Sequence, residues 1–489
     1  MTQTGLRELD SLAAVTHHMG DDKGTLKMAV EQARVEEPVA IAAGMGRRRP
    51  RVVVVGAGFG GIHVAQGLAN AAVDVTLVDR RNYHVFQPLL YQVALAVLSP
   101  ADIAQPIRLI VRNLKNVAVL MEEVVGLDTA DQRVTLQSGR ELEYDFLVLA
   151  TGSTHSYFGK KEWAANAPGL KTVEDALEIR RRVLLSFELA EREMLETGSH
   201  PPLNFVIVGG GPTGVELAGA ISDIAKLNMK HDFRHIDPKS ARVIILEGSP
   251  RILGMYPEDL QEKARQQLEG LGVEVRLSAH VTDVQPGYVM LGDERVDSVC
   301  TLWAAGVEAS PLGKMLGVET DHKGSVKVDP YLNPAGLKNV FVIGDLAAFD
   351  QNGKPVPGVA QPAMQMGDYA AKRISGMIAG KVSPKGFHYF DKGDMATIGR
   401  AAAIANVQWP FKAHLSGFPA WISWLAVHIF FLIGFRNRLS VFRSWAWTYL
   451  TFSDSARLIT GSQDLPGWGE RLVPSSALPV APEMGSPKA

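Results

Sequence analysis

The stretch that decides the fold is Arg51–Gly61, which reads RVVVVGAGFGG. A run of valines is typical of a strand buried on both faces, and the glycines after it have the spacing Gly-x-Gly-x-x-Gly. Glycines at this spacing allow a tight turn, a close approach to pyrophosphate and close packing of helix on strand. Asp79 ends the next predicted strand, 18 residues after Gly61, where a carboxylate can bind the ribose hydroxyls of an adenosine. The segment therefore predicts a Rossmann-like unit that binds a dinucleotide.

The same pattern returns at Asn204–Gly214, which reads NFVIVGGGPTG. Its spaced glycines are Gly209, Gly211 and Gly214. The acidic residue of this second unit is Glu247, 33 residues beyond the last glycine, and a charged insertion at residues 226–240 accounts for the long spacing. A glutamate there repels a 2′-phosphate and favours NADH over NADPH. Two such units predict two dinucleotides whose reactive rings meet, FAD in the first and NADH in the second.

Two later segments are predicted to return to the first sheet. Residues 146–152 read FLVLATG, a strand that runs into a tight turn at Thr151 and Gly152. Residues 340–345 form another apolar run and end in Gly344-Asp345. We therefore expect an α/β fold in which the NADH-binding unit is inserted into the FAD-binding unit.

Length and composition narrow the functional class. A chain of 489 residues is too long for a single core, so several domains are expected. Lys+Arg 50 nearly balances Asp+Glu 52, which gives no global field to attract nucleic acid. Cys300 is the only cysteine, which excludes an intrachain disulfide, thiol-pair chemistry and a Cys-rich metal cluster, and suits a reducing compartment. No metal is implied.

The order of these motifs resembles that of the two-dinucleotide-binding-domain flavoproteins. In that superfamily the disulfide reductases and the sulfide:quinone oxidoreductases use cysteine pairs, which this chain lacks. Residues 82–94 (NYHVFQPLLYQVA) and 303–307 (WAAGV) closely resemble the type II NADH:quinone oxidoreductases, which are NADH dehydrogenases that do not pump protons. The resemblance covers roughly residues 50 to 460.

The resemblance also implies the site residues. Residues 360–365 read AQPAMQ and fit a family segment beside the flavin, so Gln361 and Gln365 are expected to bind a quinone. Glu216 matches a family glutamate between nicotinamide and flavin, and Asp345 is expected at the ribityl or pyrophosphate part of FAD. The cofactor-binding positions predicted in full are Gly56, Gly58, Phe59, Gly60, Gly61, Asp79, Arg80, Gln87, Val125, Thr151, Gly152, Gly209, Gly211, Gly214, Glu247, Gly306, Gly344, Asp345 and Ala360.

The C-terminal part has a different composition. Residues 410–461 hold five Lys+Arg, one acid and four of the chain's eight tryptophans. The uncharged stretch from Pro419 to Gly434 gives a helix of about 24 Å, shorter than the ~30 Å bilayer core, so a helix lying in the membrane interface is predicted. We expect its apolar side chains to enter lipid, its arginines to meet headgroups and a second short amphipathic segment to follow. The apolar side chains are Trp421, Trp424, Leu425, Phe431 and Leu432, the arginines are Arg436, Arg438 and Arg443, and the second segment contains Trp445, Trp447 and Tyr449.

The sequence thus predicts an enzyme that oxidises NADH through FAD and passes two electrons to a membrane quinone, attached peripherally to the cytoplasmic side of the cell membrane. The division expected is a flexible extension (1–49), an FAD-binding domain (50–160 and 308–390), an NADH-binding domain (161–307), a membrane-anchoring module (391–461, with lipid contact at about 418–452) and a disordered tail (462–489). The alternatives are a soluble flavin reductase that serves a protein such as a ferredoxin, and a non-catalytic NADH sensor. A buried helix in a soluble homodimer interface also stays open.

Overall fold

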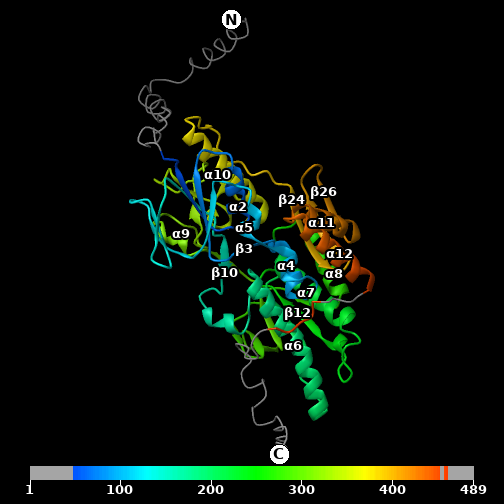
Figure 1. The fold of residues 1–489 in the computed structure, drawn as a ribbon. Helices are drawn as coiled ribbons and strands as arrows, with labels where there is room; N and C mark the ends of the chain where they lie inside the picture. Colours follow the sequence, from blue (N-terminus) through cyan, green and yellow to red (C-terminus); the bar gives the residue numbers. More distant parts are fainter. Residues whose placement is uncertain (1–47, 452–455, 461–489) are drawn as a thin grey trace, which may run out of the picture.

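The structure, a computed structural model, describes residues 48–451 and 456–460, and Figure 1 shows how their elements are arranged. The predictions for residues 1–47 and for the tail at 462–489 lie outside the described residues. Two parallel sheets, one above the other in the view of Figure 1, form the centres of two α/β units. The sheets agree with the predicted α/β class.

The first sheet has the strand order β20-β9-β1-β2-β5, and all its pairings are parallel. Its strands are β1 (Arg51–Val55), β2 (Asp74–Asp79), β5 (Val117–Met121), β9 (Phe146–Leu149) and β20 (Val340–Val342). The valine run forms the central strand, whose last four residues are buried. Because β2 lies on one side of β1 and β9 on the other, the crevice at their carboxyl ends is the position where such sheets bind ligands.

Helices α2 (Phe59–Gly67) and α10 (Ala360–Ile378) pack closely beside this sheet (Figure 1). Small residues make this approach possible, since a Cβ on Gly367 would lie 2.5 Å from the carbonyl oxygen of Gly60. A Cβ on Gly60 would in turn lie 3.2 Å from the carbonyl oxygen of Ala363, in the first turn of α10. The AQPAMQ segment is thereby held next to the first glycine turn.

The second sheet has the order β13-β12-β11-β17, again all parallel. Its strands and main helices are β11 (Asn204–Val208), β12 (Arg242–Leu246), β13 (Val273–Arg276), β17 (Cys300–Trp303), α6 (Val173–Thr197), α7 (Pro212–Asp223) and α8 (Glu258–Gly270). All of these elements lie in the chain between β9 and β20 of the first sheet. The second unit is therefore inserted into the first, as the motif order predicted.

Smaller elements complete the two units. The remaining strands are β3 (Tyr83–Val85) with β4 (Ala104–Pro106), β6 (Val124–Asp128) with β7 (Arg133–Leu136) and β8 (Glu141–Glu143), β10 (Ser153–His155) with β18 (Val307–Ala309), β14 (Asp283–Gln285) with β15 (Tyr288–Leu291) and β16 (Glu294–Asp297), β19 (Val326–Lys327) with β21 (Ala347–Ala348), and β22 (Asp350–Gln351) with β23 (Lys354–Pro355). The short helices are α3 (Leu90–Ala94), α4 (Pro100–Ile103), α5 (Ile107–Val111) and α9 (Leu312–Met315). Strands β10 and β18 pair where the chain passes between the units.

The C-terminal part is an antiparallel sheet followed by two helices. Its elements are β24 (Gly393–Gly399), β25 (Ala402–Val407), β26 (Ala413–Ser416), α11 (Phe418–Phe431) and α12 (Phe435–Thr451). Of the two helices, α11 packs on the sheet and α12 packs against α11 and α4. This part does not stand apart, because buried side chains of β24, α11 and α12 belong to the same hydrophobic core as α6 and α7. A Cβ on Gly219 of α7 would overlap the carbonyl oxygen of Ile398 in β24, so helix and strand meet directly.

The lipid contacts predicted for Trp424 and Leu432 are wrong. Each side chain is only 1% exposed, because this face of α11 packs into the protein core rather than outward. The outward stripe of α11 consists of other apolar residues, namely Phe418, Ile422, Val427 and Phe430. A second difference is that α12 is one helix of 17 residues, so the arginines and Trp445 share a single element.

Within residues 48–451 and 456–460, no helix combines the length and the apolar character that crossing a bilayer requires.

The contact between α7 and β24 gives a stability prediction. Gly219→Ala places a methyl group against the backbone of Ile398, where no side chain can move aside, so we expect a loss of about 2 kcal/mol or more, seen as a lower melting temperature. Gly270→Ala, at the end of α8, is the matched control, since its Cβ would meet nothing within 4 Å. Equal melting temperatures for the two variants would contradict the close contact.

Candidate active site

The two glycine turns have the same local geometry. Gly56 and Gly209 each end a central strand with positive φ, +98° and +107°, which favours glycine. A Cβ on Gly61 would overlap the carbonyl oxygen of Gly56, and a Cβ on Gly214 would overlap that of Gly209. By contrast, a Cβ on Gly58 or Gly211 would meet nothing within 4 Å. Each turn therefore leaves an open cradle before a helix N-terminus, which suits a pyrophosphate.

The two acidic residues also occupy equivalent positions. Asp79 accepts hydrogen bonds from the backbone N–H of Ala57 at 2.7 Å and of Arg81 at 2.8 Å. Glu247 accepts from the backbone N–H of Gly210 at 2.6 Å and of Ser249 at 2.7 Å. The carboxylates are thus fixed beside the cradles with lone pairs left for ribose hydroxyls.

The strand-end turns beside each cradle match as well. A Cβ on Gly56 would lie 2.5 Å from the carbonyl oxygen of Ala150, and one on Gly209 would lie 2.5 Å from that of Ala304. Thr151 and Gly152 therefore border the first cradle in the way that Gly306 borders the second. The Thr151 hydroxyl is buried and has no hydrogen-bond partner among the described residues, as expected for a group that a cofactor satisfies.

Asp345 lies beside the first cradle and is held by a chain of polar contacts. Gly344, with φ +68°, turns the chain after β20, and Ser153 donates to the Asp345 carboxylate at 2.8 Å. The Lys171 ammonium donates to the Ser153 hydroxyl at 3.0 Å. This carboxylate, the open glycine turn and the unpartnered Thr151 hydroxyl fit FAD in the first unit.

Aromatic rings cover the start of α2. Phe59 lies edge-on to His84 and Phe86, with centroid separations of 5.1 and 5.8 Å. The Nδ1 of His84 lies 2.9 Å from the carbonyl oxygen of Ala57, and burial lowers the pKa of its imidazole. The histidine is therefore neutral at physiological pH, and its Nδ1–H donates to the glycine turn.

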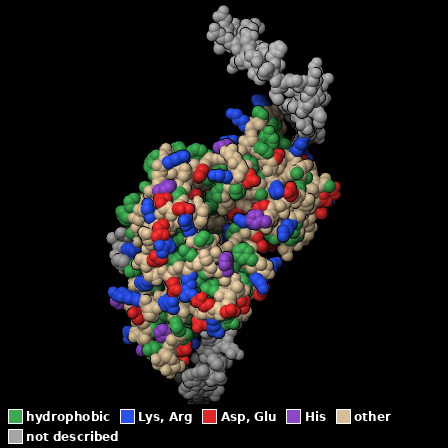
Figure 2. All heavy atoms as spheres, turned by 180° about the vertical axis from the view of Figure 1, so that it is seen from behind, with side chains coloured by type: hydrophobic (Ala, Val, Ile, Leu, Met, Phe, Trp, Pro, Cys, Tyr) green, Lys and Arg blue, Asp and Glu red, His purple; other side chains and the backbone are tan. Residues whose placement is uncertain are grey.

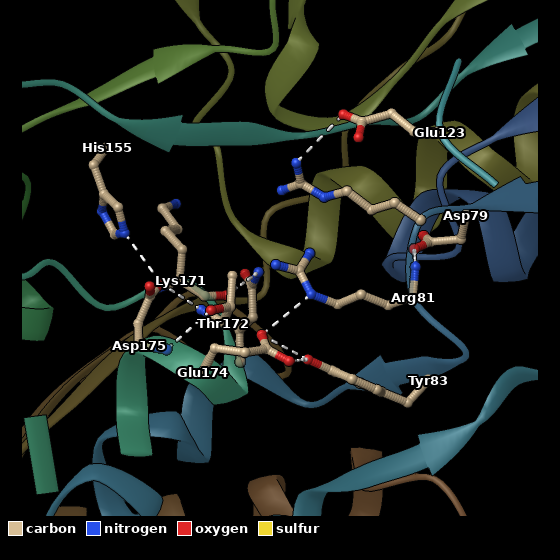
Figure 3. Close-up of polar contacts among 11 residues, drawn as sticks. Asp79, Arg81, Tyr83, Glu123, His155, Lys171, Thr172, Glu174 and Asp175 are labelled. Carbon is tan, nitrogen blue, oxygen red and sulfur yellow. Dashed lines mark hydrogen bonds and ion pairs between the residues drawn. The ribbon is translucent and has the colours of Figure 1, made fainter. Parts of the chain in front are cut away.

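Figure 3 shows the polar contacts at the boundary of the two units, where Arg81 and Tyr83 both reach Glu174 at the start of α6. Asp175 lies between His155, at 3.1 Å, and the backbone N–H of Lys171, at 3.0 Å. Of the predicted positions nearby, Gln87 donates weakly to the carbonyl oxygen of Lys171 at 3.5 Å.

The other two predicted positions in this region are exposed. Arg80 pairs with Glu123 at 3.8 Å, and Val125 lies on strand β6. Arg80 and Val125 thus lie near the edge at which β2 ends. Their contact with FAD stays a prediction.

Gln361 and Gln365 lie in the first turns of α10, and both hold the segment that leads into β24. Gln361 donates to the carbonyl oxygen of Gly393 at 2.9 Å, while its own side-chain oxygen is buried without a partner among the described residues. Gln365 donates to the carbonyl oxygen of Phe390 at 3.0 Å and accepts from its N–H at 2.9 Å. Both glutamines therefore have a structural role that the sequence did not reveal.

Glu216 lines a cavity of about 120 Å³ between α3, α7, β24, α11 and α12. Apolar and aromatic side chains form most of its wall, among them Leu425, Trp421 and Trp424. Burial raises the pKa of the Glu216 carboxyl to about 8, against a hydrogen bond from the Thr397 backbone that lowers it. At neutral pH the side chain is therefore mainly protonated.

A chain of buried hydrogen bonds reaches the same cavity from α12 and was not predicted. Trp445 donates to Gln92 at 2.7 Å, Gln92 donates to the Tyr91 hydroxyl at 3.0 Å, and Tyr91 and Thr397 share a hydrogen bond of 2.9 Å. Tyr91 and Gln92 lie within the motif at residues 82–94, but nothing marks Thr397 in the sequence. Its role depends on the C-terminal sheet docking against α7.

Comparisons with known proteins place these features in a family. Residues 50–367 match the family model described as pyridine nucleotide-disulphide oxidoreductase. Two proteins of Mycobacterium tuberculosis, type II NADH:quinone oxidoreductases Ndh and NdhA, are 43% and 44% identical to this chain. Each alignment covers 85% of this chain, with 91% of Ndh and 89% of NdhA. The chain belongs to the type II NADH:quinone oxidoreductase family. The predicted family is confirmed.

Solved structures support the fold. NDH2 of Plasmodium falciparum, solved in complex with NADH, aligns with a TM-score of 0.74 at 19% identity, over 85% of this chain and 100% of that one. The sulfide:quinone oxidoreductase of Aquifex aeolicus aligns with a TM-score of 0.62 at 19% identity, over 86% and 98%. Cys300 is buried, and burial raises the pKa of its thiol to about 12, so this family member keeps the fold without a reactive thiol.

A prediction concerns the first cradle. Asp79→Ala removes the carboxylate that is fixed beside the glycine turn, so we expect at least about tenfold weaker flavin retention, from lost charge-assisted hydrogen bonds. Absorbance of the flavin released during dialysis measures it. Asp74→Ala, an exposed change at the other end of β2, should retain flavin like the parent chain. Equal retention in both variants would place the flavin elsewhere.

The Glu216 pKa gives a pH prediction. An unfolded chain ionises this carboxyl near pH 4.5, while the folded chain holds its proton until about pH 8, so native stability falls as pH rises between these values. Glu216→Gln removes this loss. The stability of the variant relative to the parent should rise by at most about 1.4 kcal/mol per pH unit across this window and level off above it.

Thermal unfolding of the flavin-loaded proteins over this pH range measures the effect, with the exposed Glu193→Gln as a control that shows no such trend. A difference between Glu216→Gln and the parent that stays constant with pH would contradict the raised pKa.

Proposed function

We propose that this protein oxidises NADH and reduces a membrane quinone through bound FAD, without proton pumping. The observation that carries the proposal is the pair of equivalent cradles, at Gly56–Gly61 and Gly209–Gly214, in a chain whose relatives at 43–44% identity are type II NADH:quinone oxidoreductases. FAD, when bound, accepts two electrons from NADH and passes them to the quinone.

The chain's own residues position the reactants. The first cradle, Asp79, Thr151 and Asp345 hold FAD, and the second cradle with Glu247 holds NADH. Gly152 and Gly344, with φ of +65° and +68°, turn the chain beside the first cradle, and Gly306 borders the second. Holding the two ligands so that their rings meet supplies the rate gain that positioning gives. Arg80, Gln87, Val125 and Ala360 are proposed as further FAD contacts.

Proton supply is proposed for Glu216. Reduction of a quinone to a quinol takes two electrons and two protons, and NADH brings two electrons and one proton. Glu216 holds a proton on its carboxyl at neutral pH because burial raises its pKa to about 8. Gln361 and Gln365 are proposed to bind the quinone. Because the buried unpartnered oxygen of Gln361 is only an acceptor, Gln361 would bind a quinone carbonyl through the N–H of its amide.

Peripheral membrane attachment through residues 418–452 is the second part of the proposal. Leu439, Phe442 and Trp447 of α12 are exposed, as is the outward stripe of α11. Arg436 and Arg443 are exposed on the same helix and suit lipid headgroups. We place this surface against the cytoplasmic face of the cell membrane, and we keep the predicted division at 50–160 with 308–390, 161–307 and 391–461.

A putidaredoxin reductase in covalent complex with putidaredoxin aligns with a TM-score of 0.57 at 20% identity, over 75% of this chain and 83% of that one. The fold therefore does not distinguish quinone reduction from electron transfer to a protein acceptor. Figure 2 shows Lys, Arg, Asp and Glu side chains intermingled over the face opposite to the view of Figure 1, without the single-signed field that steers a charged protein partner. The high identity to quinone-reducing relatives favours the quinone.

The test separates the two halves of the reaction. Anaerobic NADH should bleach the visible absorbance of the flavin, and a water-soluble quinone should restore it. Gln361→Ala and Gln365→Ala should slow only the recovery, by about tenfold or more for a lost hydrogen-bonding group. Bleaching that no quinone reverses would overturn quinone reduction.

The matched control is Gln351→Ala. Gln351 holds the backbone of Tyr389 through both side-chain atoms, at 3.1 and 2.7 Å, just as Gln365 holds Phe390. Gln351 lies on strand β22, outside the proposed quinone site at Gln361 and Gln365. If recovery slowed equally in Gln351→Ala, the effect of Gln365 would be structural rather than specific to the quinone.

A further inference from the structure

The loop that follows the second acidic residue is fastened to the second cradle at both ends. Glu247 accepts a hydrogen bond from the backbone N–H of Gly210 at 2.6 Å, and the backbone N–H of Leu253 donates to the carbonyl oxygen of the same glycine at 2.8 Å. Leu253 has φ +53°, a conformation that residues other than glycine rarely adopt. The residues between these two contacts, 248–252, therefore have a fixed position beside the glycine turn.

The middle of this loop presents a cation. Ser249, Pro250 and Arg251 are exposed, whereas Ile252 is buried. Arg251 comes four residues after Glu247, the residue that is proposed to bind the adenosine ribose of NADH. In dinucleotide-binding units that take NADPH, an arginine near this position binds the 2′-phosphate. The chain therefore carries, beside a glutamate that repels a 2′-phosphate, a side chain of the kind that binds one.

The guanidinium of Arg251 is already paired with a carboxylate. Its Nη1 contacts the Oε1 of Glu258, the first residue of helix α8. Glu262 lies one turn further along the same helix. The pKa of its carboxyl is lowered chiefly by a hydrogen bond from Arg265, and the charge of Arg251 contributes. The positive charge of Arg251 is thus directed at α8.

The Arg251–Glu258 pair contributes little to the stability of the fold. The side chain of Arg251 is 52% exposed and that of Glu258 is 77% exposed, and ion pairs between such exposed groups are weak. What the pair changes is the charge that the loop offers to a ligand, because together the two side chains carry no net charge. A 2′-phosphate that binds Arg251 has to displace one carboxylate, Glu258, and approach another, Glu247. Both steps oppose the binding of NADPH.

We propose that Glu258 is a specificity-determining residue that acts through Arg251, so that the second cradle discriminates against NADPH with two carboxylates. Glu247 repels the 2′-phosphate directly, and Glu258 withholds the cation that would bind it. The inference rests on the proposed function, because it concerns the dinucleotide held at the second cradle. It identifies the rejected ligand as an adenosine with a 2′-phosphate and makes Glu258 a positioning residue for Arg251.

The test compares NADPH with NADH as reductant of the full-length, flavin-loaded protein, by anaerobic stopped-flow bleaching of the flavin. In a Glu247→Gln background, Glu258→Gln should raise the ratio of the NADPH rate constant to the NADH rate constant by at least about threefold, because the freed guanidinium binds the 2′-phosphate. Adding Arg251→Gln should remove this gain. The matched control is Glu269→Gln, which breaks an ion pair with Arg265 of 2.6 Å at the other end of α8 and should leave the ratio unchanged.

The binding of adenosine 2′,5′-bisphosphate, measured by calorimetry against adenosine 5′-monophosphate, separates this inference from the proposed function, because it requires no turnover. Glu247→Gln/Glu258→Gln should favour the bisphosphate more than Glu247→Gln does. An unchanged preference in a protein whose parent chain is reduced by NADH would overturn this inference alone. A gain of equal size with and without Arg251 would also overturn it, since Glu258 would then act only as one more negative charge. Failure of NADH to bleach the flavin of the parent chain would overturn the proposed function itself.

Discussion

The whole arrangement depends on how closely a helix can approach the strand before it. At Gly61 and at Gly214 any side chain would overlap the carbonyl oxygen of the first glycine in the same turn. Only glycine lets the helix N-terminus lie directly over the end of the central strand, where its free N–H groups face an anion. Because this occurs twice in the chain, two dinucleotides can be held by backbone alone, and side chains remain available for specificity and chemistry.

Inserting one unit into the other makes these cradles cooperate. The chain leaves the first sheet after β9, builds the second sheet and returns at β20, and the paired strands β10 and β18 hold the two crossings together. Glu174 and Asp175, at the start of α6, then bind groups from the outgoing crossing and from β3. The relative position of the cradles is therefore fixed by these polar contacts together with a shared hydrophobic core, in which residues 86–103 pack with α6 and α7.

Much of this could be predicted from local patterns. The cradles, Asp79, Glu247 and the return strands are encoded within a few residues each, so the sequence was sufficient to place them. The C-terminal part was predicted less well, because α11 is apolar on all sides, and periodicity does not say which side faces lipid. Trp424 is buried only because α11 packs on β24 and β25, and Thr397 approaches Glu216 only because β24 docks on α7. Such contacts between distant segments leave no local signal.

If nicotinamide and flavin meet between the two cradles, flavin reduction should show a deuterium isotope effect. NADH that carries deuterium on the transferred position of C4 should bleach the bound flavin several times more slowly than ordinary NADH in anaerobic stopped-flow mixing, and deuterium on the other face of C4 should have little effect. Equal rates for all three would mean that hydride transfer between adjacent rings does not limit flavin reduction. Absence of bleaching would mean that NADH does not reduce a flavin bound to this protein.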